Sequence, residues 1–272
     1  MNVYFDTSSW NHLVDHPDGE KLIRLIQQRK QLVLGSVITV GEVLRIQGDL
    51  RRQKICSAMR TLHGDGPLLE HPFDLAHAAA QAILQGQEDF RLPRTGPGNY
   101  LLHCIVDATQ PPPQDEIWAW LGNMEEKWEE SKAQLNLLDL KPDLNRLPDV
   151  LGNDAFLKIL CQLQPAKKLE ASDSQMRAIC GKSDVWKALG ATLAYMIKPS
   201  TTHAPKNKKG KKRAGSRDLW QAPYLGVVFE FVTGDELMLA AIDEISSVAL
   251  FRYPRCTELS HSFFERLLLA GK

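Results

Sequence analysis

Residues 217–237 read RDLWQAPYLGVVFEFVTGDEL, and this stretch decides the fold that we expect. Asp218 lies near its beginning, at the expected start of a helix, and the apolar residues 227–232 have the pattern of a buried strand. A second acid, Asp235, comes just after that strand. In a parallel α/β sheet, strand ends and helix starts gather at one edge, where ligands bind. We therefore expect the two carboxylates to lie close together.

Length and composition restrict the class of protein. The chain has 272 residues, 43% of them hydrophobic, with a formal net charge of zero, enough for one large core or a core with a small accessory domain. Its five cysteines are scattered and never spaced as CxxC, which argues against a disulfide framework or a structural zinc site. No signal peptide is evident, and no apolar run approaches the roughly 18 residues of a membrane span. We expect a soluble cytoplasmic protein with no membrane partner.

The chain begins with another strand followed by an acid. Residues 2–5 (NVYF) predict a short strand that Asp6 ends, and the hydroxyls of Thr7, Ser8 and Ser9 offer N-caps for a helix over residues 10–14. A carboxylate here would lie beside a helix N-terminus, which stabilises negative charge. Taken alone, Asp6 is explained more simply as a helix cap.

A third acid follows the next predicted strand. Residues 20–30 predict an amphipathic helix and residues 31–34 a strand, after which Ser36 is the expected N-cap of a helix running to about residue 63. Thr39 and Glu42 lie three apart on one face of it. Glu42 has apolar neighbours, where a lone carboxylate is costly unless a metal or an arginine compensates its charge. An ion pair with Arg45 is the alternative to a metal.

We expect a third strand over residues 67–71 and an alanine-rich helix over residues 74–87. From there the character of the chain changes, and we interpret residues 91–205 as a helical insertion with helices over residues 116–138, 143–163 and 171–197. Its tryptophans are better explained as helix packing than as a surface for stacking nucleobases; they are Trp118, Trp120, Trp128 and Trp186.

Residues 206–216 form a basic segment that leads directly to the acid at position 218. It has no acid and no apolar periodicity, so we expect a flexible loop. Such runs are most often solvated, but beside an acidic site this one would hold phosphates and bind nucleic acid in a salt-sensitive way. The basic residues expected to do so are Lys206, Lys208, Lys209, Lys211, Lys212, Arg213 and Arg217.

The end of the chain completes the alternation. Residues 236–242 predict a helix, residues 247–252 (SVALFR) a last strand, and Ser260 the N-cap of a terminal helix ending near residue 270. Strands alternating with helices favour an α/β fold with a parallel sheet.

Four acids are therefore expected at one edge of this sheet: Asp6, Glu42, Asp218 and Asp235. Carboxylate oxygens suit hard cations, and Mg²⁺ or Mn²⁺ bound there would lower the pKa of a water and neutralise charge developing on a phosphate. Without metal, the crowded carboxylates would repel each other and the pKa of one or more would rise.

In its motifs the sequence resembles the PIN-domain nucleases. The matching pieces are VYFDTS at residues 3–8, S-x-x-T-x-x-E at residues 36–42, RDLWQAPYLG at residues 217–226 and FVTGD at residues 231–235. The resemblance implies a three-layer α/β/α nuclease core with a central parallel sheet, built from residues 1–90 and 217–272. It implies catalytic and metal-binding roles for Asp6, Glu42, Asp218 and Asp235, supported by the hydroxyls of Thr7, Ser8, Thr39 and Thr233.

Two features depart from the family pattern. The gap between Glu42 and Asp218 is far longer than a minimal domain of this family would have, and the family explains nothing of residues 91–216. Pro223 also lies within the helix expected after Asp218, where it removes a backbone donor.

The hypothesis that we favour is a metal-dependent endoribonuclease in which water attacks the phosphodiester, RNA being preferred to DNA as the partner. A catalytically inactive PIN-like scaffold that binds nucleic acid or a protein partner through the insertion is the alternative. A third reading is a magnesium-dependent enzyme acting on a small phosphorylated substrate, against which the basic loop argues. The oligomeric state stays open.

Overall fold

The structure is a computed structural model that describes residues 2–64, 68–87, 147–163, 169–197, 216–253 and 255–270, together with residues 90, 126 and 166. Several predictions lie outside these residues: the helix over residues 116–138 apart from residue 126, three of the four tryptophans, and the basic side chains from Lys206 to Arg217.

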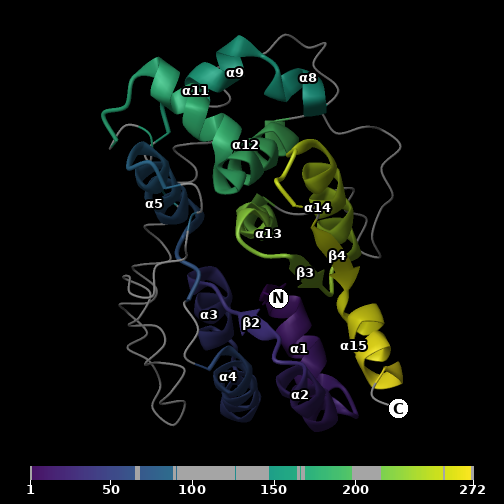
Figure 1. The fold of residues 1–272 in the computed structure, drawn as a ribbon. Helices are drawn as coiled ribbons and strands as arrows, with labels where there is room; N and C mark the ends of the chain where they lie inside the picture. The colour runs from purple at the N-terminus through teal and green to yellow at the C-terminus, as the bar shows by residue number, and fades with distance from the viewer. Residues whose placement is uncertain are drawn as a thin grey trace.

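A four-stranded, all-parallel sheet forms the centre of the fold, in the order β2-β1-β3-β4 (Figure 1). Its strands are β1 (Asn2–Phe5), β2 (Leu32–Leu34), β3 (Glu230–Thr233) and β4 (Cys256–Leu259). Val3 of β1 is paired with Val33 of β2 on one side and with Glu230 of β3 on the other. The chain thus moves from β1 to β2 in one direction and later adds β3 on the opposite side of β1. The strand order reverses between β1 and β3, and ligands bind at such reversals in parallel sheets.

Helices cover both faces of the sheet, compatible with a three-layer α/β/α arrangement. Tyr4 and Phe5 are neighbours on β1, so their side chains point to opposite faces of the sheet. The Phe5 ring contacts the rings of Trp10, Phe263 and Phe264 from the helices of one face. These packed helices are α1 (Thr7–Asp15), α2 (Gly19–Gln28), α4 (Asp49–His63) and α15 (Ser260–Leu269).

The face on which Tyr4 lies is covered by segments from the second half of the chain. The Tyr4 ring packs 5.1 Å from that of Tyr224, centroid to centroid. Tyr224 belongs to the 3₁₀ helix η1 (Ala222–Gly226), which packs against α12 (Asp184–Ile197) and α14 (Glu236–Val248). The other helices in the described ranges are α3 (Val37–Leu44), α5 (Pro72–Leu84), α8 (Leu147–Leu151), α9 (Asp154–Leu160), α11 (Asp173–Lys182) and α13 (Ser216–Leu219).

Helix α12 packs directly on the elements around the sheet, although it falls within the predicted insertion. A Cβ atom on Gly226 would lie 2.4 Å from the Cα of Val185, so only glycine permits this approach of η1 to α12. The Trp186 indole is buried and donates to the carbonyl of Ala76 at 2.8 Å. The predicted core role of this tryptophan is confirmed, whereas the domain boundaries remain a prediction.

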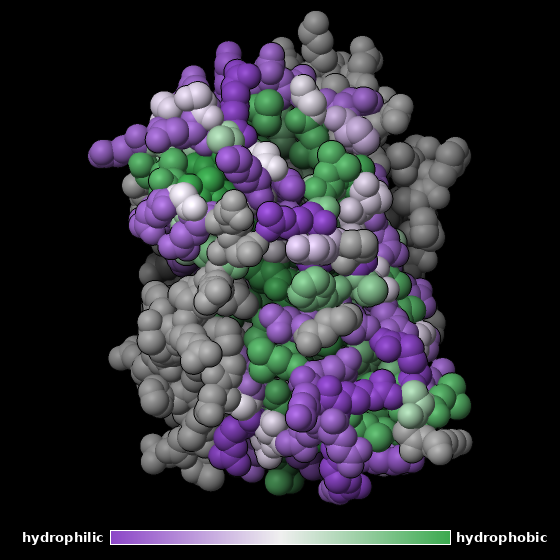
Figure 2. All heavy atoms as spheres, in the orientation of Figure 1, coloured by the Kyte–Doolittle hydropathy of each residue, from purple (hydrophilic) through white to green (hydrophobic). Residues whose placement is uncertain are grey.

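Hydrophilic residues gather over α1 and α2 in Figure 2. Helix α2 explains part of this surface, because Leu22 and Ile26 are buried while Glu20, Lys21 and Arg24 lie on its outer side. Within the described part of the chain, no helix is both long and apolar enough to cross a membrane.

The structure corrects the helix predicted from residue 37 to residue 63. Helix α3 ends at Leu44 and α4 starts at Asp49, and between them Gly48 has a φ of 113°. That left-handed conformation favours glycine and breaks the helix. Likewise, each of the helices predicted over residues 143–163 and 171–197 is two helices, with Ser183 separating α11 from α12.

Two strand predictions are also wrong. The expected strand over residues 67–71 is only an isolated parallel bridge between Ser36 and Leu69. The expected strand over residues 247–252 is the end of α14 followed by a loop, in which Leu250 has a φ of 47° and is exposed. The last strand is instead β4, whose residues are only partly buried because it lies at the sheet edge.

Ser260 is the first residue of α15 rather than its N-cap, which is Leu259 and contributes no side-chain hydrogen bond. The Ser260 side chain is buried, and its hydroxyl forms a hydrogen bond with the hydroxyl of Ser9 in α1 at 2.8 Å. This hydroxyl therefore contacts α1 and does not cap α15.

Candidate carboxylate site at the ends of β1 and β3

Asp6 follows β1 and is buried, with 6% of its surface exposed. Its Oδ1 accepts hydrogen bonds from the backbone N–H and the hydroxyl of Ser9, both at 2.8 Å, so capping of α1 by Asp6 is confirmed. The N-caps expected at Thr7, Ser8 and Ser9 are wrong, because α1 begins at Thr7 and contains all three residues. The Ser8 hydroxyl lies 2.7 and 2.8 Å from the two carboxylate oxygens. Thr233 donates to Oδ2 at 2.6 Å. Capping therefore explains one oxygen of Asp6, and the other is held by β3.

Burial sets the proton affinity of Asp6. It raises the pKa of the carboxyl above its usual range, against the hydrogen bonds from Thr233, Ser8 and Ser9, which lower the pKa. Among the residues that the structure describes, no lysine or arginine pairs with Asp6. Within that part of the chain, the Asp6 carboxylate is contacted by neutral donors alone.

Thr233 ties the second acid to the first. Its hydroxyl accepts the backbone N–H of Asp235 at 3.1 Å while it donates to Asp6. Asp235 is half-buried and caps α14, with its Oδ1 accepting from the N–H groups of Leu237 and Met238 at 2.8 and 3.3 Å. Thr233 therefore joins the segment that follows β1 to the segment that follows β3, beside the point where the strand order reverses.

Gly234 allows these two loops to touch. Its N–H donates to the Ser8 hydroxyl at 2.6 Å, and a Cβ at this position would lie 2.9 Å from the same oxygen. A larger residue would force Ser8 away from the Asp6 carboxylate.

Glu42 lies on α3 and is half-buried. The Thr7 hydroxyl donates to its Oε2, which connects α3 to the start of α1 immediately after Asp6. The predicted N-cap Ser36 is confirmed, since its hydroxyl accepts the N–H of Thr39 at 3.1 Å. Glu42 thus contacts Thr7, the residue next to Asp6 in the chain, and Thr233 connects Asp6 to Asp235.

Asp218 lies on a separate segment of the chain, which follows the predicted basic loop. It is half-buried in α13, a helix of four residues, and not at the start of a long helix as predicted. Its carbonyl accepts the N–H of Gln221 at 3.1 Å. Pro223 lies in the first turn of the separate helix η1, where a missing N–H is tolerated.

The donor set suits a hard cation, but it is not assembled around one. Among the described residues, no three histidine, cysteine, aspartate or glutamate side chains are grouped closely enough to hold a metal ion. His12 of α1 and His16, the C-cap of that helix, also belong to no such group of described residues, although their ring centroids lie 6.1 Å apart.

Comparison of the chain with protein families, curated proteins and solved structures found no match. The resemblance to PIN-domain nucleases therefore stays a prediction from the motifs.

Sequence reasoning missed the buried contacts of three polar residues around the site, of which Ser9 was expected only as an N-cap. Ser9 is fully buried, and its hydroxyl lies 2.8 Å from both the Asp6 carboxylate and the carbonyl of Val232, so its one proton is available to either acceptor. Tyr4 and Gln221 share a buried hydrogen bond although they lie 217 positions apart. For Tyr4 the available signal was one hydroxyl in an otherwise apolar strand, since a buried tyrosine hydroxyl usually has a partner.

Proposed function

We propose that this chain is a metal-dependent endoribonuclease of the PIN-like type, with its site at the carboxyl ends of β1 and β3. The observation that carries the proposal is the hydrogen bond from Thr233 to Asp6, which holds two acid-bearing loops together where the strand order reverses. The link from Thr7 to Glu42 adds a third acid to the same neighbourhood.

A divalent cation suits the unbalanced charge of Asp6. The donors are oxygens only, which favours Mg²⁺ or Mn²⁺ over softer metals. The residues that would hold the ion are Asp6, Glu42, Asp218 and Asp235. Since no group of three ligands is assembled among the described residues, binding would require at least one acidic side chain to move.

When bound, the metal would supply a water of lowered pKa and stabilise charge on the phosphate. The chain's own contribution would be positional. Ser8 and Thr233 hold the buried Asp6 carboxylate, and Thr7 is placed next to it to orient Glu42 or a water. The basic residues 206–217 would bind the RNA backbone through its phosphates.

The proposal is tested by cleavage of end-labelled single-stranded RNA and DNA with Mn²⁺, Mg²⁺ or EDTA. Wild type should cut RNA only with metal, and Asp6→Asn and Asp235→Asn should not cut. Asp18→Asn is the matched control, because Asp18 is exposed and its side chain makes no capping bond to α2. Equal cutting by all four proteins would overturn the acid site.

The alternative is a catalytically inactive scaffold that binds nucleic acid or a protein partner. It is favoured by one observation, that both oxygens of Asp6 are already satisfied by the chain's own donors. Absence of cutting of either strand by wild type in any metal, together with retained RNA binding, would support this alternative.

A further inference from the structure

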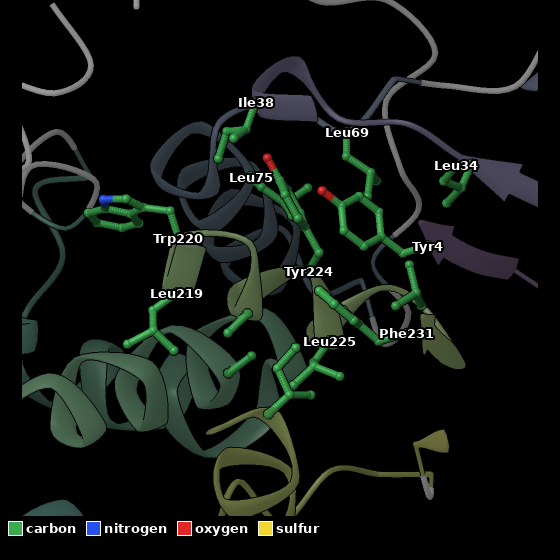
Figure 3. Close-up of a cluster of buried hydrophobic side chains, with 14 of the residues drawn as sticks. Tyr4, Leu34, Ile38, Leu69, Leu75, Leu219, Trp220, Tyr224, Leu225 and Phe231 are labelled. Carbon is green, nitrogen blue, oxygen red and sulfur yellow. The ribbon is translucent and has the colours of Figure 1, made fainter. Parts of the chain in front are cut away.

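The hydroxyl of Tyr4 is the centre of a polar cluster inside the core. Tyr4 is fully buried, and Figure 3 shows its ring beside that of Tyr224 among apolar side chains. The hydroxyl donates to the side-chain carbonyl of Gln221 at 2.7 Å. It also lies 2.7 Å from the Thr39 hydroxyl and 2.9 Å from the Ser36 hydroxyl.

The roles of these atoms follow from their chemistry. The Gln221 oxygen can only accept, so the single proton of Tyr4 is used there, and Ser36 or Thr39 must donate to Tyr4. The cluster is therefore fully bonded and specifies one arrangement of its members.

Each partner belongs to a segment that carries one of the acids. Tyr4 lies two residues before Asp6 on β1, and Thr39 lies three residues before Glu42 on α3. Gln221 lies three residues after Asp218, and its N–H is bonded to the Asp218 carbonyl. The Tyr4 hydroxyl thus connects the three segments that carry Asp6, Glu42 and Asp218. Thr233 connects Asp6 to the segment that carries Asp235.

We propose that Tyr4 is a positioning residue for the carboxylate site, whose hydroxyl fixes the placement of the segments that carry Asp6, Glu42 and Asp218. The inference rests on the proposed function, because it concerns the metal affinity and activity of that site. Partners that orient metal ligands typically change affinity or activity by about 10- to 100-fold when they are removed.

The test compares Tyr4→Phe with Tyr224→Phe. Tyr224 is the matched control, because it is also fully buried and its hydroxyl donates to the carbonyl of Glu70 at 3.0 Å. Burial raises the pKa of the Tyr224 hydroxyl, and a hydrogen bond with Ser36 opposes that rise. Among the described residues, this hydroxyl has no hydrogen bond to Thr39 or Gln221. Both variants lose one buried hydroxyl, so similar losses of stability are expected.

Two readouts separate positioning from packing. Binding of Mn²⁺, followed by the electron paramagnetic resonance signal of the free ion, should weaken about tenfold or more in Tyr4→Phe and stay near wild type in Tyr224→Phe. The kcat for RNA cleavage should fall by a similar factor in Tyr4→Phe with KM for RNA unchanged. Gln221→Met, which leaves Tyr4 in place, should show the same pattern if Tyr4→Phe does not fold.

The outcomes are distinct. Wild-type Mn²⁺ affinity and kcat in both Tyr4→Phe and Gln221→Met, or equal losses in Tyr224→Phe, would show that Tyr4 acts only in packing. A wild type that neither binds Mn²⁺ nor cuts RNA would overturn the proposed function itself, and the positioning role with it.

Discussion

The Thr233 hydroxyl donates to the Asp6 carboxylate at 2.6 Å, joining two residues 227 positions apart in the chain. The bond crosses from the end of β3 to the end of β1, where strand order reverses. Because Thr233 also accepts the N–H of Asp235, a single side chain sets the relation between two acids.

Thr233→Val keeps the shape of the side chain and removes its donor. Since a hydrogen bond to a charged group contributes about 1.5–3 kcal/mol, the free energy of unfolding should fall by about that amount at pH 7. Urea denaturation measures the change. Thr192→Val is the control, because Thr192 is also buried but donates to a carbonyl within its own helix. An equal loss in both variants would show that Thr233 has no special importance.

The raised pKa of Asp6 predicts how stability varies with pH in the absence of metal. Protonated Asp6 favours the folded state, so its contribution is full below the unfolded pKa of about 3.9 and is lost as pH rises through the folded pKa. The free energy of unfolding of wild type relative to Asp6→Asn should therefore decrease from pH 4 to pH 7. Urea titrations of both proteins in EDTA measure it. A relative gain of wild type with rising pH would contradict the assigned direction.

Metal should reverse that disadvantage. If Mn²⁺ binds the folded protein at Asp6, saturation at about 100 times the dissociation constant adds about 2.7 kcal/mol to the free energy of unfolding. Thermal unfolding with and without Mn²⁺ should show a higher Tm for wild type and for Asp18→Asn, and no change for Asp6→Asn. A shift of equal size in Asp6→Asn would place the metal elsewhere.

The sequence predicts those parts of the site whose structure depends on residues close together in the chain. The strand before Asp6 and the N-cap Ser36 follow from short-range patterns, and each is present. Strand β4 escaped prediction because its sequence, CTEL, is too polar for a buried strand, while SVALFR has the composition of one. The bond between Tyr4 and Gln221 escaped it because only folding brings such distant positions together.

Arg266 of α15 forms ion pairs with two acids on neighbouring strands, Glu230 of β3 and Glu258 of β4. It contacts Glu230 at 2.6 Å and Glu258 at 2.7 Å, and Glu230 is buried with a pKa raised by burial and lowered by this arginine. Arg266→Met should lower the free energy of unfolding at pH 7 by about 1–3 kcal/mol, because it leaves a buried carboxylate without its cation. The control is Arg24→Met, whose ion pair with Glu20 is exposed and contributes at most about 0.5 kcal/mol. Losses of equal size in chemical denaturation would refute the difference.

Helix α12 decides whether residues 91–205 can be removed. Trp186 and Leu189 of this helix are buried in the same core as Tyr224 of η1, and Gly226 lets the two backbones meet. Replacing residues 91–205 by a short linker would remove that packing, so we expect a chain without a cooperative unfolding transition in circular dichroism. Gly226→Ala tests the same contact in the full chain, where a Cβ lying 2.4 Å from Val185 should lower the free energy of unfolding by about 1–3 kcal/mol. A deletion variant that unfolds cooperatively, with Gly226→Ala as stable as wild type, would show that α12 belongs to a separable insertion and that the α/β core folds without it.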